Sequence, residues 1–219
     1  DVIRELVGRS YIRRSKTVMI PDGVHGWDRA SDFATPYPLP RRIGMVANLV
    51  EVKGHKVLIE ALALLKSRGL DLEADLYGTD PKGSPGQISD YQNTLMSLAR
   101  DLGVDHRITF CGWVDDPWAH LGDVPVVVLP SAVEGTPNGL LEAMGRCKLV
   151  IGTDIGGTSE FLKHRRTGWI HQARDPEALA TCLQEVYQAP QDTLADIRQE
   201  AWMMWKDNYS IDACLDGLL

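Results

Sequence analysis

Short apolar runs alternate with amphipathic stretches across residues 41–188. The runs at 42–48, 73–77, 107–110, 125–129, 149–152 and 168–171 have the length of β-strands. Between them, apolar residues recur every three or four positions, as on one face of a helix. Two of these stripes end at a glycine, Gly69 and Gly103, as helices commonly do. Strands that alternate with helices in this way predict a parallel α/β sheet.

The two ends of the chain depart from this pattern. Residues 17–20 resemble a lead-in strand, and residues 35–40 form a proline-rich linker. Residues 191–206 predict a single amphipathic helix with Leu194, Ile197, Ala201 and Trp205 along one face. We therefore expect three parts: a lead-in strand and linker at 1–40, an α/β domain at 41–188 and a helical tail at 189–219.

Composition narrows the class of protein. The 219 residues carry a net charge of −7, which argues against a nucleic-acid partner. No apolar run approaches the roughly 20 residues that span a bilayer, and no charged-then-apolar leader is recognisable at the start. The four cysteines are widely spaced, as expected of reduced thiols rather than of disulfides or a zinc site. We therefore expect a cytoplasmic protein.

The segment after the apolar run 126–129 predicts an anion site. A turn that contains glycine leads into a helix, and the first N–H groups of a helix lack internal partners and favour negative charge. Thr136 is expected to cap this helix and Pro137 to occupy its first position. The N–H groups of Asn138, Gly139 and Leu140 would then be available to a phosphate, which Gly139 has no side chain to obstruct.

Two glutamates flank this predicted anion site. Glu142 follows Gly139 by three residues and shares its helix face, one turn deeper. A carboxylate there would repel phosphate but would accept hydrogen bonds from an attached ribose. Glu134 precedes the helix, where a sugar would fit on the other side of the phosphates. This arrangement suggests a nucleotide sugar, although the residues alone leave open a solvated Glu142 and a simple loop charge at Glu134.

The same segment resembles a known family. Residues 130–144 match the pattern Pro-Ser-x-x-Glu-Gly-x-Pro-x-x-x-x-Glu-Ala-Met of the retaining glycosyltransferases of the GT-B fold, called group 1. Segments 20–24, 45–54, 108–113 and 154–160 resemble other parts of that family in the same order. The resemblance extends from about residue 17 to about residue 187. It implies a Rossmann-like parallel sheet flanked by helices, the C-terminal half of a GT-B fold.

The resemblance also implies an activity and a missing partner. Such a domain binds a nucleoside-diphosphate sugar as donor, without a further cofactor, for transfer to an acceptor hydroxyl. The N-terminal GT-B domain with the acceptor site is missing from this chain, and the C-terminal tail is expected to cross toward it. We expect some of residues 202–205, Trp-Met-Met-Trp, to pack against that domain. The resemblance allows peripheral association with the inner face of the membrane.

Individual roles follow from the matched positions. Glu134 and Lys53 are the expected catalytic residues, with Lys53 neutralising the diphosphate. The expected donor-binding residues are Asn48, Lys53, Cys111, Gly112, Trp113, Gly135, Thr136, Asn138, Gly139, Leu140 and Glu142. Asn48 stands where the family usually has arginine, so a second cationic contact is in doubt. The segment 111–113 would hold the base.

Several alternatives remain open at this stage. Lys53 also fits a solvated lysine near a helix start, and Trp113 fits either a base-stacking or a core position. No Asp-x-Asp or paired-histidine motif indicates a metal; Asp115-Asp116 is expected to form a turn or helix cap, and Glu160 to cap a helix. A GT-B nucleotide-sugar epimerase and a non-catalytic nucleotide-sugar-binding module are the alternative functions.

Overall fold

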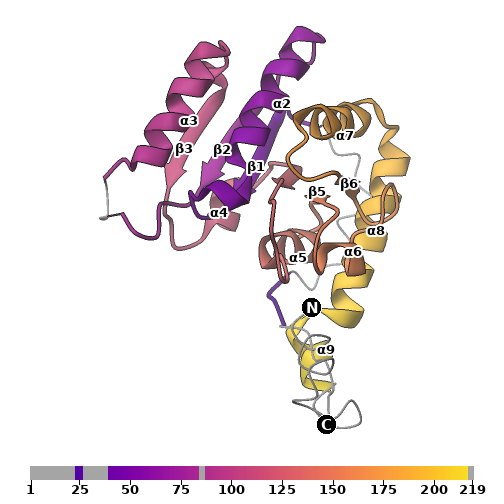
Figure 1. Ribbon diagram of the computed structural model, residues 1–219. Helices are drawn as coiled ribbons and strands as arrows, with labels where there is room; N and C mark the ends of the chain where they lie inside the picture. The colour runs from indigo at the N-terminus through magenta and orange to yellow at the C-terminus, as the bar shows by residue number, and fades with distance from the viewer. Residues whose placement is uncertain (1–22, 27–38, 84–86, 217–219) are drawn as a thin grey trace, which may run out of the picture.

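A computed structural model describes residues 23–26, 39–83 and 87–216 (Figure 1). The expected strand at 17–20 and most of the linker at 35–40 lie outside the described residues. Six strands form one sheet: β1 Arg42–Val46, β2 Glu73–Tyr77, β3 Ile108–Gly112, β4 Val126–Leu129, β5 Leu149–Thr153 and β6 Trp169–His171. All neighbouring strands pair in parallel, in the order β3-β2-β1-β4-β5-β6. The parallel α/β prediction is confirmed, and each strand lies within a few residues of its apolar run.

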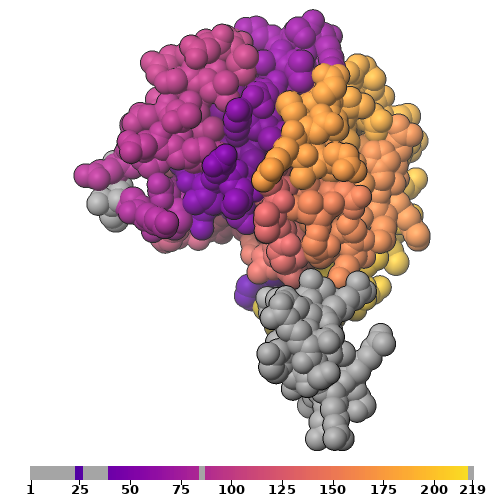
Figure 2. Space-filling model, in the orientation of Figure 1, coloured from indigo at the N-terminus to yellow at the C-terminus, as the bar shows by residue number. Residues whose placement is uncertain are grey.

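A helix follows each strand, as the alternating pattern predicts, and two more form the tail. They are α2 His55–Ser67, α3 Asp90–Asp101, α4 Pro117–Leu121, α5 Asn138–Gly145, α6 Thr158–Phe161, α7 Pro176–Gln188, α8 Gln191–Asn208 and α9 Ile211–Asp216, with short 3₁₀ turns η3 Glu51–Lys53 and η4 Asp105–Arg107. Helix α2 packs against both α3 and α7, and in Figure 2 its indigo-to-violet surface lies between the magenta and orange regions. Right-handed crossovers that run in opposite directions place α2 and α5 on opposite faces of the sheet.

The strand order determines where a ligand can bind. From β1 the chain crosses to β2 on one side, whereas from β4 it crosses to β5 on the other. β1 and β4 are neighbours, so the crossovers diverge between their carboxyl ends, and open α/β sheets bind ligands at such a point. The core below it is apolar, since β4 and β5 are buried along their whole length.

The helical tail packs on this domain. Helix α8 lies against α5, and it buries the predicted face Leu194, Ile197, Ala201 and Trp205 together with Trp202. Gly26 and Gly145 leave room for the Trp205 ring, because a Cβ on either glycine would lie within 2.6 Å of it. Some of residues 202–205 were expected to pack against the missing domain. Both tryptophans are instead buried within this chain, whereas Met203 is exposed. In the described part of the chain, no helix has the length and apolar character to cross a membrane.

Candidate functional site

Lys53 and Glu134 meet at the carboxyl ends of β1 and β4. The Lys53 Nζ lies 2.7 Å from Glu134 Oε1, and their side chains are 27% and 8% exposed. Gly54 follows Lys53 with φ +77° and lets the two segments come this close. A Cβ on residue 54 would lie 2.0 Å from the carbonyl oxygen of Pro130, at the start of the loop that carries Glu134. The structure thus brings together the two expected catalytic residues in an ion pair, and Lys53 is not the solvated lysine of the alternative interpretation.

The loop that carries Glu134 is anchored on both sides. The Ser131 hydroxyl donates to Glu134 Oε1 at 2.7 Å, and the Thr153 hydroxyl at the end of β5 donates to the Ser131 carbonyl at 2.7 Å. The Gly157 N–H donates to the Gly135 carbonyl at 2.9 Å. Sequence reasoning missed Ser131 and Thr153 as supports of Glu134. The serine of the matched family pattern was a signal for the first, whereas no local signal pointed to the second.

The start of α5 differs from the prediction. The helix begins at Asn138, and Pro137 occupies the cap position with ψ 81° and without a side-chain cap bond. Thr136 is therefore not the N-cap: its carbonyl instead accepts the Asn138 N–H at 3.0 Å, in a turn that precedes the helix.

Near the start of α5, fewer backbone N–H groups are available to a ligand than expected. The Leu140 N–H donates to the Pro137 carbonyl at 2.9 Å, and Asn138 is engaged as described above. Among the described residues, the Gly139 N–H is left without an acceptor. Gly139 also lies close to β1, since a Cβ on it would be 3.3 Å from the Val46 carbonyl oxygen. In the described part of the chain, the expected anion site therefore offers the N–H group of Gly139 instead of three such groups, and it adjoins the end of β1.

Glu142 faces a neighbouring helix. Its Oε2 accepts a hydrogen bond of 2.5 Å from the indole Nε1 of Trp118 on α4. The guanidinium of Arg146 lies 4.9 Å from the centre of the same indole ring. Glu142 is only partly exposed, so it is not the fully solvated residue that the sequence left open.

The other expected donor-binding residues follow β1 and β3. Asn48, just after β1, is exposed. In β3, burial raises the pKa of the Cys111 thiol, and the Gly112 carbonyl accepts the Gly78 N–H at 2.8 Å. Trp113 is 70% exposed, so the core alternative for this residue is wrong. Its ring is available for stacking at the same end of the sheet as Lys53 and Glu134.

The sequence also predicted capping roles for Asp115-Asp116 and for Glu160. Asp116 caps α4 and accepts from the Trp118 and Ala119 N–H groups, as expected of the Asp115-Asp116 pair. Glu160 does not cap a helix: Gly157 is the N-cap of α6, with no side-chain cap bond. Within residues 23–26, 39–83 and 87–216, no group of three or more His, Cys, Asp or Glu residues is arranged to hold a metal ion.

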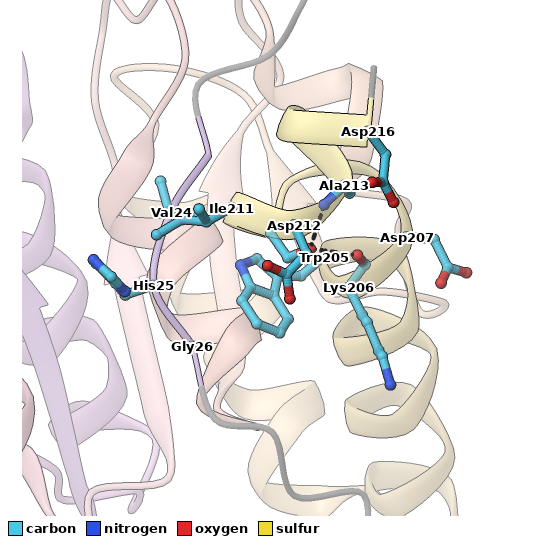
Figure 3. Close-up of a pocket in the computed structure, with 11 residues that line it drawn as sticks. Val24, His25, Gly26, Trp205, Lys206, Asp207, Ile211, Asp212, Ala213 and Asp216 are labelled. Atoms are coloured by element: carbon cyan, nitrogen blue, oxygen red, sulfur yellow. Dashed lines mark hydrogen bonds between the residues drawn. The ribbon is translucent and has the colours of Figure 1, made fainter. Parts of the chain in front are cut away.

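A cavity of about 630 Å³ lies elsewhere, between residues 24–26 and the helices α8 and α9 (Figure 3). The Trp205 indole lines it next to Gly26. Gly26 touches Gly145 at the carboxyl end of α5, whereas Glu134 precedes the opposite end of that helix. This cavity is therefore separate from the candidate site at the switch point.

Comparison with known proteins agrees with this geometry. Residues 40–189 match the family model described as glycosyl transferases group 1. The chain is 31% identical over 159 residues to the lipopolysaccharide core biosynthesis glycosyltransferase LpsE of Rhizobium meliloti, and the match covers 73% of this chain and 42% of LpsE. The chain thus spans about two fifths of the length of that curated relative.

Two solved structures share the fold. Anabaena Alr3699/HepE in complex with UDP-glucose superposes with a TM-score of 0.72 at 24% identity, over 80% of this chain and 46% of that one. The C-terminal domain of the group 1 glycosyltransferase LpcC from Francisella tularensis superposes with a TM-score of 0.67 at 22% identity, over 88% of this chain and 96% of that domain. With the family model matched over most of the sheet and its helices, this chain belongs to the group 1 glycosyltransferase family.

Proposed function

We propose that this chain is the donor-binding domain of a retaining glycosyltransferase. In the longer protein it binds a nucleoside-diphosphate sugar and supports transfer of the sugar to an acceptor hydroxyl. The observation that carries this proposal is the Lys53–Glu134 pair, 2.7 Å apart at the switch point and next to the start of α5. The UDP-glucose bound to the similarly folded HepE supports the class of ligand.

Each side of the site has a proposed task. Lys53 and the Gly139 N–H contact the diphosphate, Glu134 contacts the sugar and Glu142 the ribose. Trp113 and the backbone of 111–112 hold the base, and Asn48 adds an uncharged phosphate contact. During transfer the bond from the anomeric carbon to the β-phosphate oxygen breaks, the acceptor oxygen bonds to that carbon, and the acceptor hydroxyl passes its proton to the leaving diphosphate oxygen. Lys53 and the helix N–H stabilise the charge on the leaving diphosphate.

The acceptor side belongs to a second domain in this proposal. Residues 41–188 form the nucleotide-sugar domain, and the tail from residue 189 leads toward an N-terminal GT-B domain that carries the acceptor site. The match to LpcC, whose C-terminal domain this chain covers almost completely, supports this division. We place the longer protein in the cytoplasm, with peripheral association at the inner face of the membrane.

Calorimetric titration of the 219-residue chain with UDP and GDP tests donor binding. A half-open site keeps its ligand partly solvated, so we expect a Kd on the order of 0.1–1 mM. Glu142→Ala should weaken binding by about 1–3 kcal/mol, the range for a lost charge-assisted hydrogen bond. Glu200→Ala on α8 is the control, because Glu200 pairs with Arg166 away from the site. Equal binding by all three proteins would remove Glu142 from the site.

Product analysis with a labelled nucleotide sugar tests the activity. The 219-residue chain alone should transfer nothing, because positioning of the acceptor supplies roughly 7–11 kcal/mol of catalysis and needs the second domain. The full-length protein should transfer or hydrolyse the sugar. An epimerised donor would instead identify a GT-B epimerase, and robust transfer by the isolated chain would refute the division into two halves.

A further inference from the structure

The Trp118 indole is the closest polar partner of the Glu142 carboxylate. The family pattern at 130–144 does not include Trp118 and assigns it no role in ligand recognition. We propose that Trp118 is a positioning residue: its indole N–H holds the Glu142 carboxylate in the orientation in which it accepts hydrogen bonds from the ribose hydroxyls of the bound nucleotide. This inference rests on the proposed function of Glu142 and extends it to a residue 24 positions earlier in the chain.

The backbone of Trp118 is itself fixed. Asp116 Oδ1 accepts the N–H groups of Trp118 at 3.0 Å and of Ala119 at 3.1 Å, which caps the short helix α4. The Trp118 side chain is buried, with 7% of the residue exposed. An indole held at both its backbone and its ring has little freedom to follow the carboxylate. The carboxylate therefore adapts to the indole, rather than the reverse.

Arg146 covers the face of the same indole. Its guanidinium lies 4.9 Å from the ring centre, a distance typical of a cation–π contact. The Arg146 Nη1 also donates to the Glu142 carbonyl at 3.1 Å and to the His25 carbonyl at 2.7 Å. Because Arg146 is the C-cap residue of α5, its guanidinium links the end of this helix to the Trp118 indole on α4. The position of the Glu142 carboxylate is thus determined by two helices.

The geometry leaves Glu142 able to bind a ligand. A carboxylate has about four acceptor positions, and the indole N–H, which only donates, occupies one of them on Oε2. Among the described residues, Oε1 has no hydrogen-bond donor. Vicinal hydroxyls of a ribose match the acceptors that remain. A glutamate that is already oriented loses less side-chain freedom when a ligand binds, so the contact with Trp118 should increase affinity for the ribose.

The chain offers a matched control for this contact. Trp169 on β6 also donates its indole N–H to a glutamate, Glu185, at 3.1 Å. That carboxylate is already bound by Arg165 at 2.7 and 3.1 Å. Trp169 is at least as well buried as Trp118, so Trp169→Phe also removes a buried indole N–H, from a carboxylate that keeps Arg165 as its partner. The two pairs differ in that only Glu142 lies at the proposed nucleotide site.

The test compares UDP and GDP with their 2′,3′-dideoxy analogues, titrated into the 219-residue chain by calorimetry. The readout is the preference for the ribonucleotide over its dideoxy analogue, since a general loss of stability weakens both alike. Trp118→Phe should reduce this preference by about 3- to 10-fold and leave the dideoxy nucleotide almost unaffected. Trp169→Phe should leave the preference unchanged. In the Glu142→Gln background, Trp118→Phe should have no further effect on it. Thermal melts of each variant confirm that it is folded.

The possible outcomes separate the two proposals. If the wild-type chain binds neither UDP nor GDP, the proposed function fails, and the role of Trp118 with it. If the wild type binds and Glu142→Gln lowers the ribose preference but Trp118→Phe does not, only the role of Trp118 is overturned. Tighter ribonucleotide binding by Trp118→Phe would also overturn it, because the indole would then compete with the ribose for Glu142.

Discussion

Lys53 and Glu134 are 81 residues apart in the chain, yet the lysine ammonium and the carboxylate lie 2.7 Å apart. The two groups that we assign to the diphosphate and to the transferred sugar therefore neutralise each other in this structure. A diphosphate has to share the ammonium with Glu134 or replace the carboxylate there. The pair thus links recognition of the phosphate to the position of the group that faces the sugar.

Glu134→Ala should affect the intact donor more than the nucleotide. Loss of the carboxylate removes the proposed sugar contact, worth about 1–3 kcal/mol, but leaves Lys53 available to the diphosphate. Calorimetry with UDP-glucose and with UDP measures the two effects separately. We expect weaker binding of the sugar nucleotide and nearly unchanged binding of UDP. Equal losses for both ligands would contradict this division of tasks.

Gly54→Ala should disturb both stability and nucleotide binding. The new Cβ would lie 2.0 Å from the Pro130 carbonyl oxygen, so the loop that carries Lys53 has to move. Gly69→Ala, at the other end of α2, is a matched control: its φ is +80° against +77° for Gly54, but nothing lies within 4 Å of its Cβ.

We therefore expect Gly69→Ala to cost about 1–2 kcal/mol of stability from backbone strain alone. Gly54→Ala should cost about 1–3 kcal/mol more, because of the clash. Urea unfolding measures both values. UDP binding should weaken only in Gly54→Ala, and equal behaviour of the two variants would show that the close approach of Gly54 to Pro130 has no role in forming the site.

Donor binding should not require a divalent metal. The Lys53 ammonium and the Gly139 N–H supply positive charge to the diphosphate, and a helix N-terminus favours an anion without a metal ion. Titrations of UDP with EDTA and with added Mg²⁺ should give the same Kd. A loss of affinity of about tenfold on chelation, equivalent to about 1.4 kcal/mol, would show that a metal ion takes part in binding.

His55 should make the fold sensitive to mild acid. This residue begins α2 and is 1% exposed, and burial lowers its pKa to about 4 from the ordinary 6.5. Below pH 6.5 His55 binds a proton in the unfolded chain but not in the folded chain. The free energy of unfolding therefore falls as the pH falls toward 4. Between pH 6.5 and 5 the loss from this residue should be about 1.6 kcal/mol.

Urea unfolding of the wild type and of His55→Gln across this range measures the effect. The variant lacks the titrating group, so its free energy of unfolding should decline less steeply between pH 6.5 and 5. The difference between the two proteins isolates His55 from His171, a second buried histidine whose pKa burial also lowers. Parallel curves would contradict the prediction.

Local pattern was sufficient to predict the elements of this fold. The strand at 73–77 has the bounds that its apolar residues predicted, and the helix predicted at 191–206 begins at residue 191 and ends two residues later than expected, because periodicity of two or of 3.6 residues is a property of the segment itself. The residues that cap the helices were predicted less accurately. Asp116 caps α4 as expected, whereas Thr136 was the wrong choice for α5, because a turn that engages its carbonyl delays the helix by one residue.

The sequence by itself determined the alternating α/β architecture, the family pattern at 130–144 and the candidate residues Lys53, Glu134 and Glu142. Only the tertiary structure decided which of them meet. Glu134 pairs with Lys53 because β1 and β4 are neighbours in the sheet, and Glu142 pairs with Trp118 because the indole on α4 reaches the carboxylate on α5. Such contacts depend on strand order and helix packing between distant segments, which no local spacing encodes. Exposure was decided in the same way, since Trp113 and Trp118 have the same ring but only one is buried.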